Sequence, residues 1–246
     1  VYMKSFKKVV LGLVAAMAVV SAQADVSTLQ ANLKKNYPAT KVTSVDVTPI
    51  KGIYEVVLGK NLAYTDVTGD YFLFGDIIRM KDQSNLSSQK RDELKKIDFT
   101  ALPFKDAITY KRGNGSRKLA VFSDPQCPFC KRLETELMKL DNVTIYVFTN
   151  PLVGLHPEAR NLSKKIWCSK DKQKAWRDYL ISSIEPTSDG LCVNPVDSTV
   201  QLSRELGFDG TPMTILEDGT VVAGAVSVGE LDYKLDKVAI AKANKK

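Results

Sequence analysis

The sequence predicts an α+β protein made of two unequal domains joined by a helical linker. Three observations lead to this prediction. Residues 25–82 combine one short helical pattern with several strand-like segments. The linker, residues 83–105, contains a charged stretch, residues 84–97, with few apolar side chains. Residues 106–246 then begin with a strand, a helix and a second strand, the order typical of a βαβ unit. A chain of 246 residues is long enough for one large or two small domains.

Residues 1–24 have the three parts of a secretory signal peptide. Lysines follow Met3, an apolar run extends from Val9 to Val20, and Ala22-Gln23-Ala24 supplies small residues for cleavage before Asp25. A membrane span needs about 20 apolar residues, so an uncleaved anchor is the weaker interpretation. The four cysteines are then expected in a compartment where disulfides persist, the periplasm.

The charge of the chain gives little reason to expect a nucleic-acid partner. The formal net charge is +7, and three lysines lie within residues 1–24, which leaves +4 after cleavage. No basic patch interleaved with aromatic residues is present, so nucleic-acid binding is not predicted. No second apolar run has the length of a membrane span.

The first domain begins with a helix and continues as strands. Ser27-Thr28-Leu29-Gln30 has the form of a capping box, and the helix is expected to end before Pro38. Strands are predicted over residues 41–47, 53–58, 62–67 and 71–78. One helix and four short strands bury little apolar surface. We therefore expect this domain to associate with the second domain or with another copy of itself.

The linker and the second domain follow from local patterns. Ser87 or Ser88 is expected to cap a solvated helix over the charged run 89–96, which Pro103 ends or kinks. Strands at 107–110 and 119–122 bracket a hairpin or tight loop at 112–116. The further predicted elements are a strand at 143–148, helices at 158–167, 172–184 and 197–206, a hairpin around Asp218-Gly219, and a closing helix from about Gly229.

The stretch Cys127-Pro128-Phe129-Cys130 carries the predicted chemistry. It lies between the apolar run 119–122 and a helical pattern, so Cys127 falls at a helix N-terminus, where unpaired N–H groups and the helix dipole stabilise a thiolate. Pro128 suits the first helical position. Cys130 is close enough to resolve a mixed disulfide on Cys127. Half of a zinc site has the same spacing, but Cys168, Cys192 and the single histidine, His156, are not closely spaced, so no metal is predicted.

Together with three other features, this motif resembles the DsbC/DsbG family of periplasmic thiol:disulfide isomerases, and DsbC most closely. The features are Gly210-Thr211-Pro212 before a strand, the pair Cys168 and Cys192 in the helical region, and a small N-terminal domain with a helical linker. The resemblance extends over nearly all of residues 25–246. It implies a dimerisation domain at 25–82 and a thioredoxin fold with a helical insertion at 106–246.

The resemblance also assigns roles to residues. Cys127 and Cys130 would be catalytic, and a cis bond before Pro212 would let Thr211 and Pro212 hold an extended substrate, beside Pro128 and Phe129. Cys168 and Cys192 are better explained as a structural disulfide than as a second active pair, and Trp167 suggests that this disulfide is buried. His156 is expected to be a loop or helix-start residue. No organic cofactor is implied.

The implied function is a disulfide isomerase and reductase that rearranges misbridged exported proteins, acts as a homodimer and is kept reduced by a membrane reductase of the DsbD type. The alternatives are a DsbG-like reductase that protects single cysteines, and a chaperone with a secondary redox role. Two positions depart from better-known relatives. Pro-Phe replaces Gly-Tyr between the cysteines, and Val121 occupies the position of the buried acid of thioredoxin. Asp124 is then the nearest candidate for proton transfer, although an Asp before Pro more often caps a turn.

Overall fold

A computed structural model describes residues 25–59 and 61–244 of the chain. The predicted signal peptide, residues 1–24, lies outside the described residues. Within the described ranges, no helix has the length and apolar character needed to cross a membrane. The chain divides into two compact units between Leu94 and Lys95, a point inside the predicted linker of residues 83–105.

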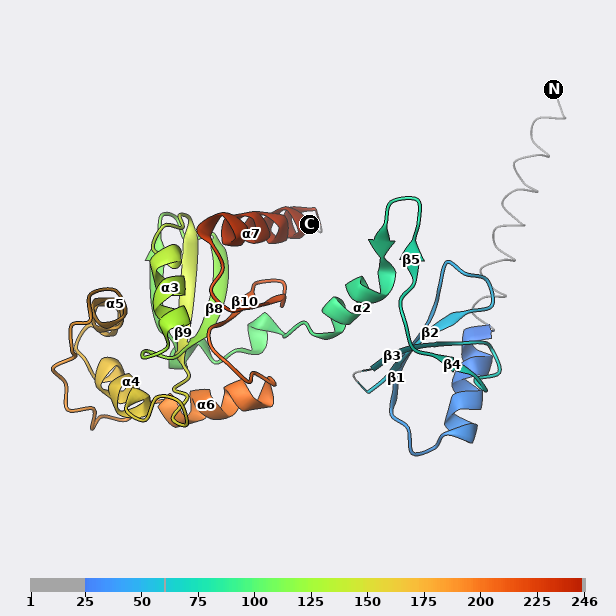
Figure 1. Cartoon of the computed structure of the whole chain (residues 1–246), viewed down its shortest axis with the longest axis horizontal. Helices are drawn as coiled ribbons and strands as arrows, with labels where there is room; N and C mark the ends of the chain where they lie inside the picture. Colours follow the sequence, from blue (N-terminus) through green and yellow to red (C-terminus); the bar gives the residue numbers. More distant parts are fainter. Residues whose placement is uncertain (1–24, 60, 245–246) are drawn as a thin grey trace, which may run out of the picture. The chain divides into compact units, whose positions relative to one another are not determined.

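The first unit packs one helix on a four-stranded antiparallel sheet (Figure 1). The helix is described over residues 25–36, and the first three strands are β1 (Val42–Val47), β2 (Tyr54–Leu58) and β3 (Asn61–Thr65). Leu29 and Leu33, one helical turn apart, are buried against Val45, Tyr54 and Val56 of the sheet. The predicted helix and the first three predicted strands are therefore present. Residues 25 and 26 are already helical, so Ser27 lies within the helix and its predicted role as the N-cap is wrong.

The predicted fourth strand, residues 71–78, is much shorter than expected. Only β4 (Phe72–Leu73) pairs with β3, and β4 is the edge of the sheet. The chain then forms a separate small hairpin from β5 (Ile78–Arg79) and β6 (Ser84–Asn85). The β-branched and aromatic composition indicated a longer strand, but strand propensity is weak where no sheet neighbour buries the side chains.

The linker helix α2 (Leu86–Leu94) is capped differently from the prediction. The Asn85 side chain accepts a hydrogen bond from the Ser88 N–H at 2.8 Å, which is the N-cap interaction expected of Ser87 or Ser88. Ser87 is instead buried, and its hydroxyl accepts from the Ile77 N–H at 2.7 Å and lies 2.5 Å from the Tyr64 hydroxyl. These contacts tie the start of α2 to the first unit.

The second unit is a mixed five-stranded sheet in the order β11-β10-β8-β9-β7. β8 (Arg117–Ser123), α3 (Pro128–Leu137) and β9 (Val143–Thr149) form the predicted βαβ unit, with β8 and β9 parallel. β10 (Met213–Leu216) and β11 (Val221–Ala223) form the predicted hairpin, and β10 pairs antiparallel with β8. Central strand β8 therefore ends directly before the cysteine motif.

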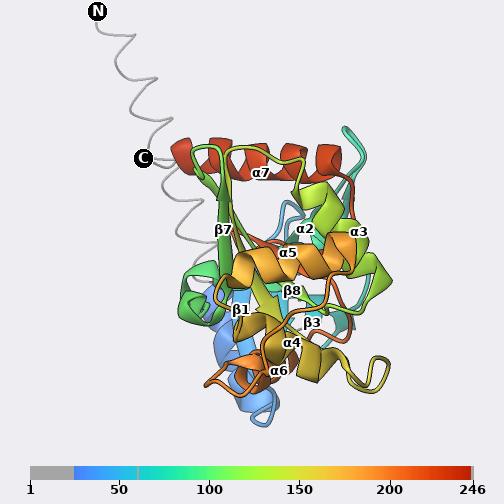
Figure 2. The same ribbon diagram turned by 90° about the vertical axis from the view of Figure 1, so that its left-hand side faces the viewer.

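Alternate residues of β8 face two separate hydrophobic cores. Leu119 and Val121 pack with α3, with α4 (Ala159–Trp167), with α5 (Lys172–Ser182) and with α7 (Val228–Ala243). Ala120 and Phe122 pack beneath α6 (Val196–Glu205) and two 3-10 turns, Phe99–Ala101 and Phe104–Asp106. Helices therefore cover both faces of the sheet (Figures 1 and 2). This three-layer arrangement fixes the position of α3 relative to β8.

Residues 112–116 form a loop, so the alternative prediction of a hairpin at this segment is wrong. β7 (Ile108–Arg112) pairs antiparallel with β9 and not with β8, so the segment is a loop that passes from the edge of the sheet to its centre. The hairpin at Asp218-Gly219 is confirmed. Gly219 is required there, because an added Cβ would lie 2.3 Å from the carbonyl oxygen of Ile97 and the residue has φ of +87°.

The insertion between β9 and β10 contains three helices, α4 (Ala159–Trp167), α5 (Lys172–Ser182) and α6. α5 lies beside α3 and α4 (Figure 2). A disulfide joins Cys168, after α4, to Cys192, before α6. Trp167 is buried, but Cys192 is exposed, so the expected burial of this disulfide is wrong on the Cys192 side.

Candidate active site

The cysteine motif occupies the junction between β8 and α3. Cys127 is the N-cap of α3 and Pro128 takes a first-turn position, as predicted from the sequence. The side chains of Pro128 and Phe129 are exposed, with 60% of Phe129 accessible, whereas Cys127 and Cys130 are 6% and 1% exposed. Both cysteines are free thiols, and the more accessible of them lies at the helix N-terminus.

Cys130 lies in an environment that disfavours its thiolate. Burial raises the pKa of its thiol to about 12, although the hydroxyls of Ser123 and Thr211 and the backbone N–H of Asp124 act in the opposite direction. The Asp124 N–H donates to the Cys130 Sγ at 3.3 Å. At neutral pH Cys130 is therefore a protonated, shielded thiol, a state that suits a resolving partner better than an attacking nucleophile.

The segment before β10 brings two further predicted site residues to the cysteines. The Cys127 thiol donates to the carbonyl oxygen of Thr211 at 3.6 Å, across 84 positions of sequence. The Thr211–Pro212 bond is cis, as the resemblance implies, and Pro212 is buried. Cys127, Cys130, Thr211, Pro128 and Phe129 therefore meet at one end of the sheet, whereas Cys168 and Cys192 lie in the insertion.

Asp124 connects the site to the loop that follows β9. Its Oδ1 accepts from the Gln126 N–H at 2.7 Å, which is the turn-capping interaction expected of an Asp before Pro. Its Oδ2 accepts from the Leu152 N–H at 2.7 Å and lies 2.9 Å from the Nδ1 of His156. Asp124 itself contacts Cys130 through its backbone N–H.

Two family models match this chain in consecutive parts. The thioredoxin-like domain model matches residues 104–239, and the disulfide bond isomerase protein N-terminal domain model matches residues 20–88. The chain belongs to the DsbC family of thiol:disulfide interchange proteins. It is 33% identical over 210 residues to the probable thiol:disulfide interchange protein DsbC of Bordetella pertussis. The matched residues are 84% of this chain and 74% of that protein.

Two further similar proteins agree with this assignment. DsbC of Escherichia coli K12 is 28% identical over 219 residues, which are 88% of this chain and 89% of that protein. A crystal structure of a disulfide interchange protein from Neisseria gonorrhoeae superposes with a TM-score of 0.54 at 41% identity, over 55% of this chain and 97% of that structure. The fold class predicted from the sequence is thereby confirmed, and the protein is a thiol:disulfide interchange enzyme.

A buried carboxyl group behind the motif of this DsbC-family protein was not predicted. Glu134 on α3 is 2% exposed and accepts from the Tyr110 hydroxyl at 2.6 Å and from the Trp176 Nε1 at 3.1 Å. Burial raises the pKa of Glu134, while these two donors and Arg177 lower it. Glu134 lies four residues after Cys130 and three before Leu137 on the buried face of α3, so helical periodicity could have identified it.

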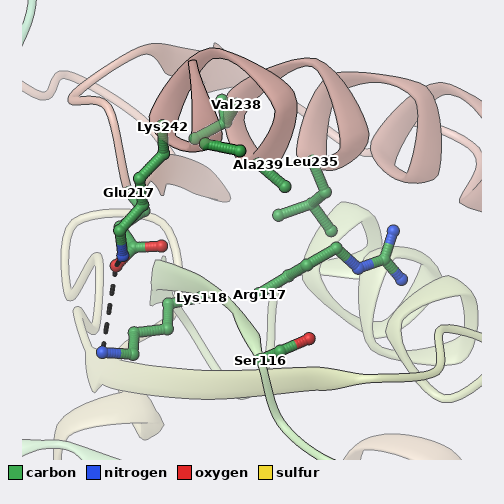
Figure 3. A pocket seen from close by; sticks show the side chains of 9 residues that line it. Ser116, Arg117, Lys118, Glu217, Leu235, Val238, Ala239 and Lys242 are labelled. Atoms are coloured by element: carbon green, nitrogen blue, oxygen red, sulfur yellow. Dashed lines mark hydrogen bonds and ion pairs between the residues drawn. The ribbon is translucent and has the colours of Figure 1, made fainter. Parts of the chain in front are cut away.

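A separate hollow of about 360 Å³ lies between α7 and the start of β8, at the opposite end of that strand from the cysteines (Figure 3). Leu235, Val238 and Ala239 of α7 line it, together with charged side chains that form ion pairs. Glu217 pairs with Lys118 at 3.8 Å and with Lys242 at 2.7 Å. Because these charges are compensated, the hollow offers no reactive group, and the cysteine end of the sheet is the candidate site.

Proposed function

We propose that this protein is a periplasmic disulfide isomerase and reductase that acts through the dithiol of Cys127 and Cys130. The observation that supports it most is the contrast between the two cysteines. Cys127 caps α3, whereas burial holds Cys130 as a thiol. An attacking sulfur at a helix N-terminus and a shielded resolving thiol three residues later are what disulfide exchange needs.

Each step of the proposed reaction uses groups near this pair. The Cys127 thiolate attacks one sulfur of a non-native substrate disulfide, forms a mixed disulfide and releases the other substrate sulfur as a thiolate. Exposed Pro128 and Phe129 contact the substrate on one side, and Thr211 and Pro212 hold its extended backbone on the other. A second substrate thiol then displaces Cys127, which completes isomerisation, or Cys130 displaces the substrate, which completes reduction. No metal or organic cofactor takes part.

We further propose that the protein is a homodimer held together by its N-terminal unit. Tyr71, Leu73, Phe74 and Met80 expose between 58% and 77% of their surface along the edge strand β4 and the following hairpin. An unpaired edge with apolar side chains is typical of a surface that another chain covers. Two dithiols in one dimer would retain a misfolded substrate for a second exchange, and a membrane reductase of the DsbD type would return the oxidised pair to its dithiol.

Purified full-length protein tests this function with a scrambled, disulfide-containing substrate. We expect Cys127→Ser to abolish both reduction and the recovery of native substrate. We expect Cys130→Ser to accumulate substrate as mixed disulfides, because internal release is lost. A Cys127→Ser variant that still restores native disulfides would contradict the proposal. Full reduction without rearrangement would favour the DsbG-like reductase, which shares a Pro-aromatic dipeptide.

A further inference from the structure

The candidate site contains a buried aspartate whose backbone contacts both cysteines of the dithiol motif. Asp124 is 0% exposed, its carbonyl oxygen accepts from the Cys127 N–H at 3.2 Å, and its own N–H donates to the Cys130 Sγ. A negative charge in this position opposes a second negative charge on a neighbouring sulfur. The charge on Asp124 therefore acts against the thiolate that disulfide exchange requires.

The donors around this carboxylate are of two kinds. Gln126 and Leu152 contribute backbone N–H groups, which satisfy hydrogen bonds but carry no net charge. The third partner is the imidazole of His156, the single histidine of the chain, whose side chain is 23% exposed. His156 reaches solvent and also contacts Asp124, so a protonated imidazole would place a positive charge directly beside the buried carboxylate.

Other polar and charged side chains lie near this part of the site, but no titratable one among the described residues is hydrogen-bonded to the Asp124 carboxylate apart from His156. Gln126, Tyr179, Glu158, Glu185 and Lys165 line a hollow of about 230 Å³ beside the motif, and the Lys131 Nζ lies 5.1 Å from the centre of the Tyr179 ring. Burial raises the pKa of Tyr179, a hydrogen bond with Gln126 lowers it, and the charges of Glu185 and Asp124 raise it further. Among the described residues, His156 is the one titratable side chain hydrogen-bonded to the Asp124 carboxylate.

We propose that His156 is a positioning residue that sets the charge facing the dithiol, so that a protonated imidazole offsets Asp124 and favours the reduced pair. The proposal rests on the dithiol function of Cys127 and Cys130 proposed above. In glutathione, reduction adds two electrons to the Cys127–Cys130 bond and breaks it. The products are a thiolate on Cys127 and a thiol on Cys130, while two glutathione thiols become glutathione disulfide and one proton passes to solvent.

Two substitutions separate charge from hydrogen bonding. His156→Asn keeps an N–H donor near the carboxylate but cannot become positively charged, whereas His156→Lys restores a positive charge with a different shape. Lys111→Gln is the matched control, because it removes one positive charge from an exposed residue of β7 at the far end of the sheet. His156→Gln is a second neutral variant, so a folding defect in one variant does not decide the result.

The measured quantity is the equilibrium constant between dithiol and disulfide in glutathione mixtures at about pH 5.5, where an ordinary imidazole carries its proton. It is read by acid quenching, alkylation and mass spectrometry. We expect His156→Asn to shift this constant about tenfold toward the disulfide, the size expected for one unit charge at short range in a partly screened site. His156→Lys should remain within about threefold of the unsubstituted protein, and Lys111→Gln within about twofold.

Two results would overturn the inference while leaving the proposed function intact. A His156→Asn constant equal to that of the unsubstituted protein would mean that the imidazole acts only as a hydrogen-bond donor. A shift in His156→Lys as large as in His156→Asn would mean that ring shape matters and charge does not. Failure of Cys127 and Cys130 to form a disulfide in any glutathione mixture would overturn the proposed function and this inference together.

Discussion

Removing the Tyr110 hydroxyl with Tyr110→Phe should destabilise the second unit in a pH-dependent way. The hydroxyl donates to the Glu134 Oε1 at 2.6 Å, and both side chains are 2% exposed. A hydrogen bond to a charged group contributes roughly 1.5–3 kcal/mol, and water cannot replace this one because the site is buried. We therefore expect the free energy of unfolding to fall by about 2 kcal/mol at neutral pH.

The pH dependence follows from the effect of this donor on Glu134. The Tyr110 hydroxyl lowers the pKa of Glu134, which burial raises, so its removal raises that pKa further. A raised folded-state pKa contributes stability at acidic pH that is lost as the pH rises through it. The difference between Tyr110→Phe and the unsubstituted protein should therefore be largest at neutral pH and shrink to about 1 kcal/mol or less where Glu134 is protonated.

Urea unfolding followed by tryptophan fluorescence measures this unit alone, because both tryptophans of the chain, Trp167 and Trp176, lie in it. Tyr146→Phe on strand β9 is the matched control. The Tyr146 ring packs 4.4 Å from Phe104 between ring centres, and its hydroxyl has no hydrogen bond within the described residues. The assigned role of Glu134 would be refuted if Tyr110→Phe lowered the free energy of unfolding no more than Tyr146→Phe does. It would also be refuted if the loss were the same at neutral pH and at the acidic pH where Glu134 is protonated.

Three further outcomes are expected. Replacing Cys168 and Cys192 by Ala should lower stability by up to about 3.5 kcal/mol, the chain-entropy value for a loop of this length, and should leave turnover unchanged at moderate temperature; loss of turnover with the fold intact would contradict a structural role. Cys130, whose pKa burial raises to about 12, should resist alkylation at neutral pH and react only in strongly alkaline solution, and labelling of Cys130 before its partner thiol would reverse the two roles. Phe74→Asp should yield monomers in sedimentation at micromolar concentration, because it places a charge on the proposed dimer surface, whereas Ile240→Asp, on another exposed residue, in α7, should leave the dimer intact.

Features that depend only on neighbouring residues were predicted correctly from the sequence. Pro128 at a first-turn position, the Asp218-Gly219 hairpin and the βαβ order around the cysteine motif follow from local sterics, turn chemistry and hydrophobic periodicity. These rules act over a few residues, so they can be applied without knowing the path of the chain. They failed where strand propensity alone was used, because within residues 71–78 only Phe72 and Leu73 pair with the four-stranded sheet.

The distant groups that surround the cysteines are set by long-range packing and could not be predicted from the sequence. β7 pairs with β9 because the parallel β8–β9 unit occupies the centre of the sheet, and a loop of the same composition could equally have formed a hairpin. His156 lies 32 positions from Asp124, and Trp176 lies 42 positions from Glu134. No local pattern encodes such contacts. They form when helices cover the two apolar faces of the sheet, because the polar groups buried there form hydrogen bonds with groups on other helices, strands or loops.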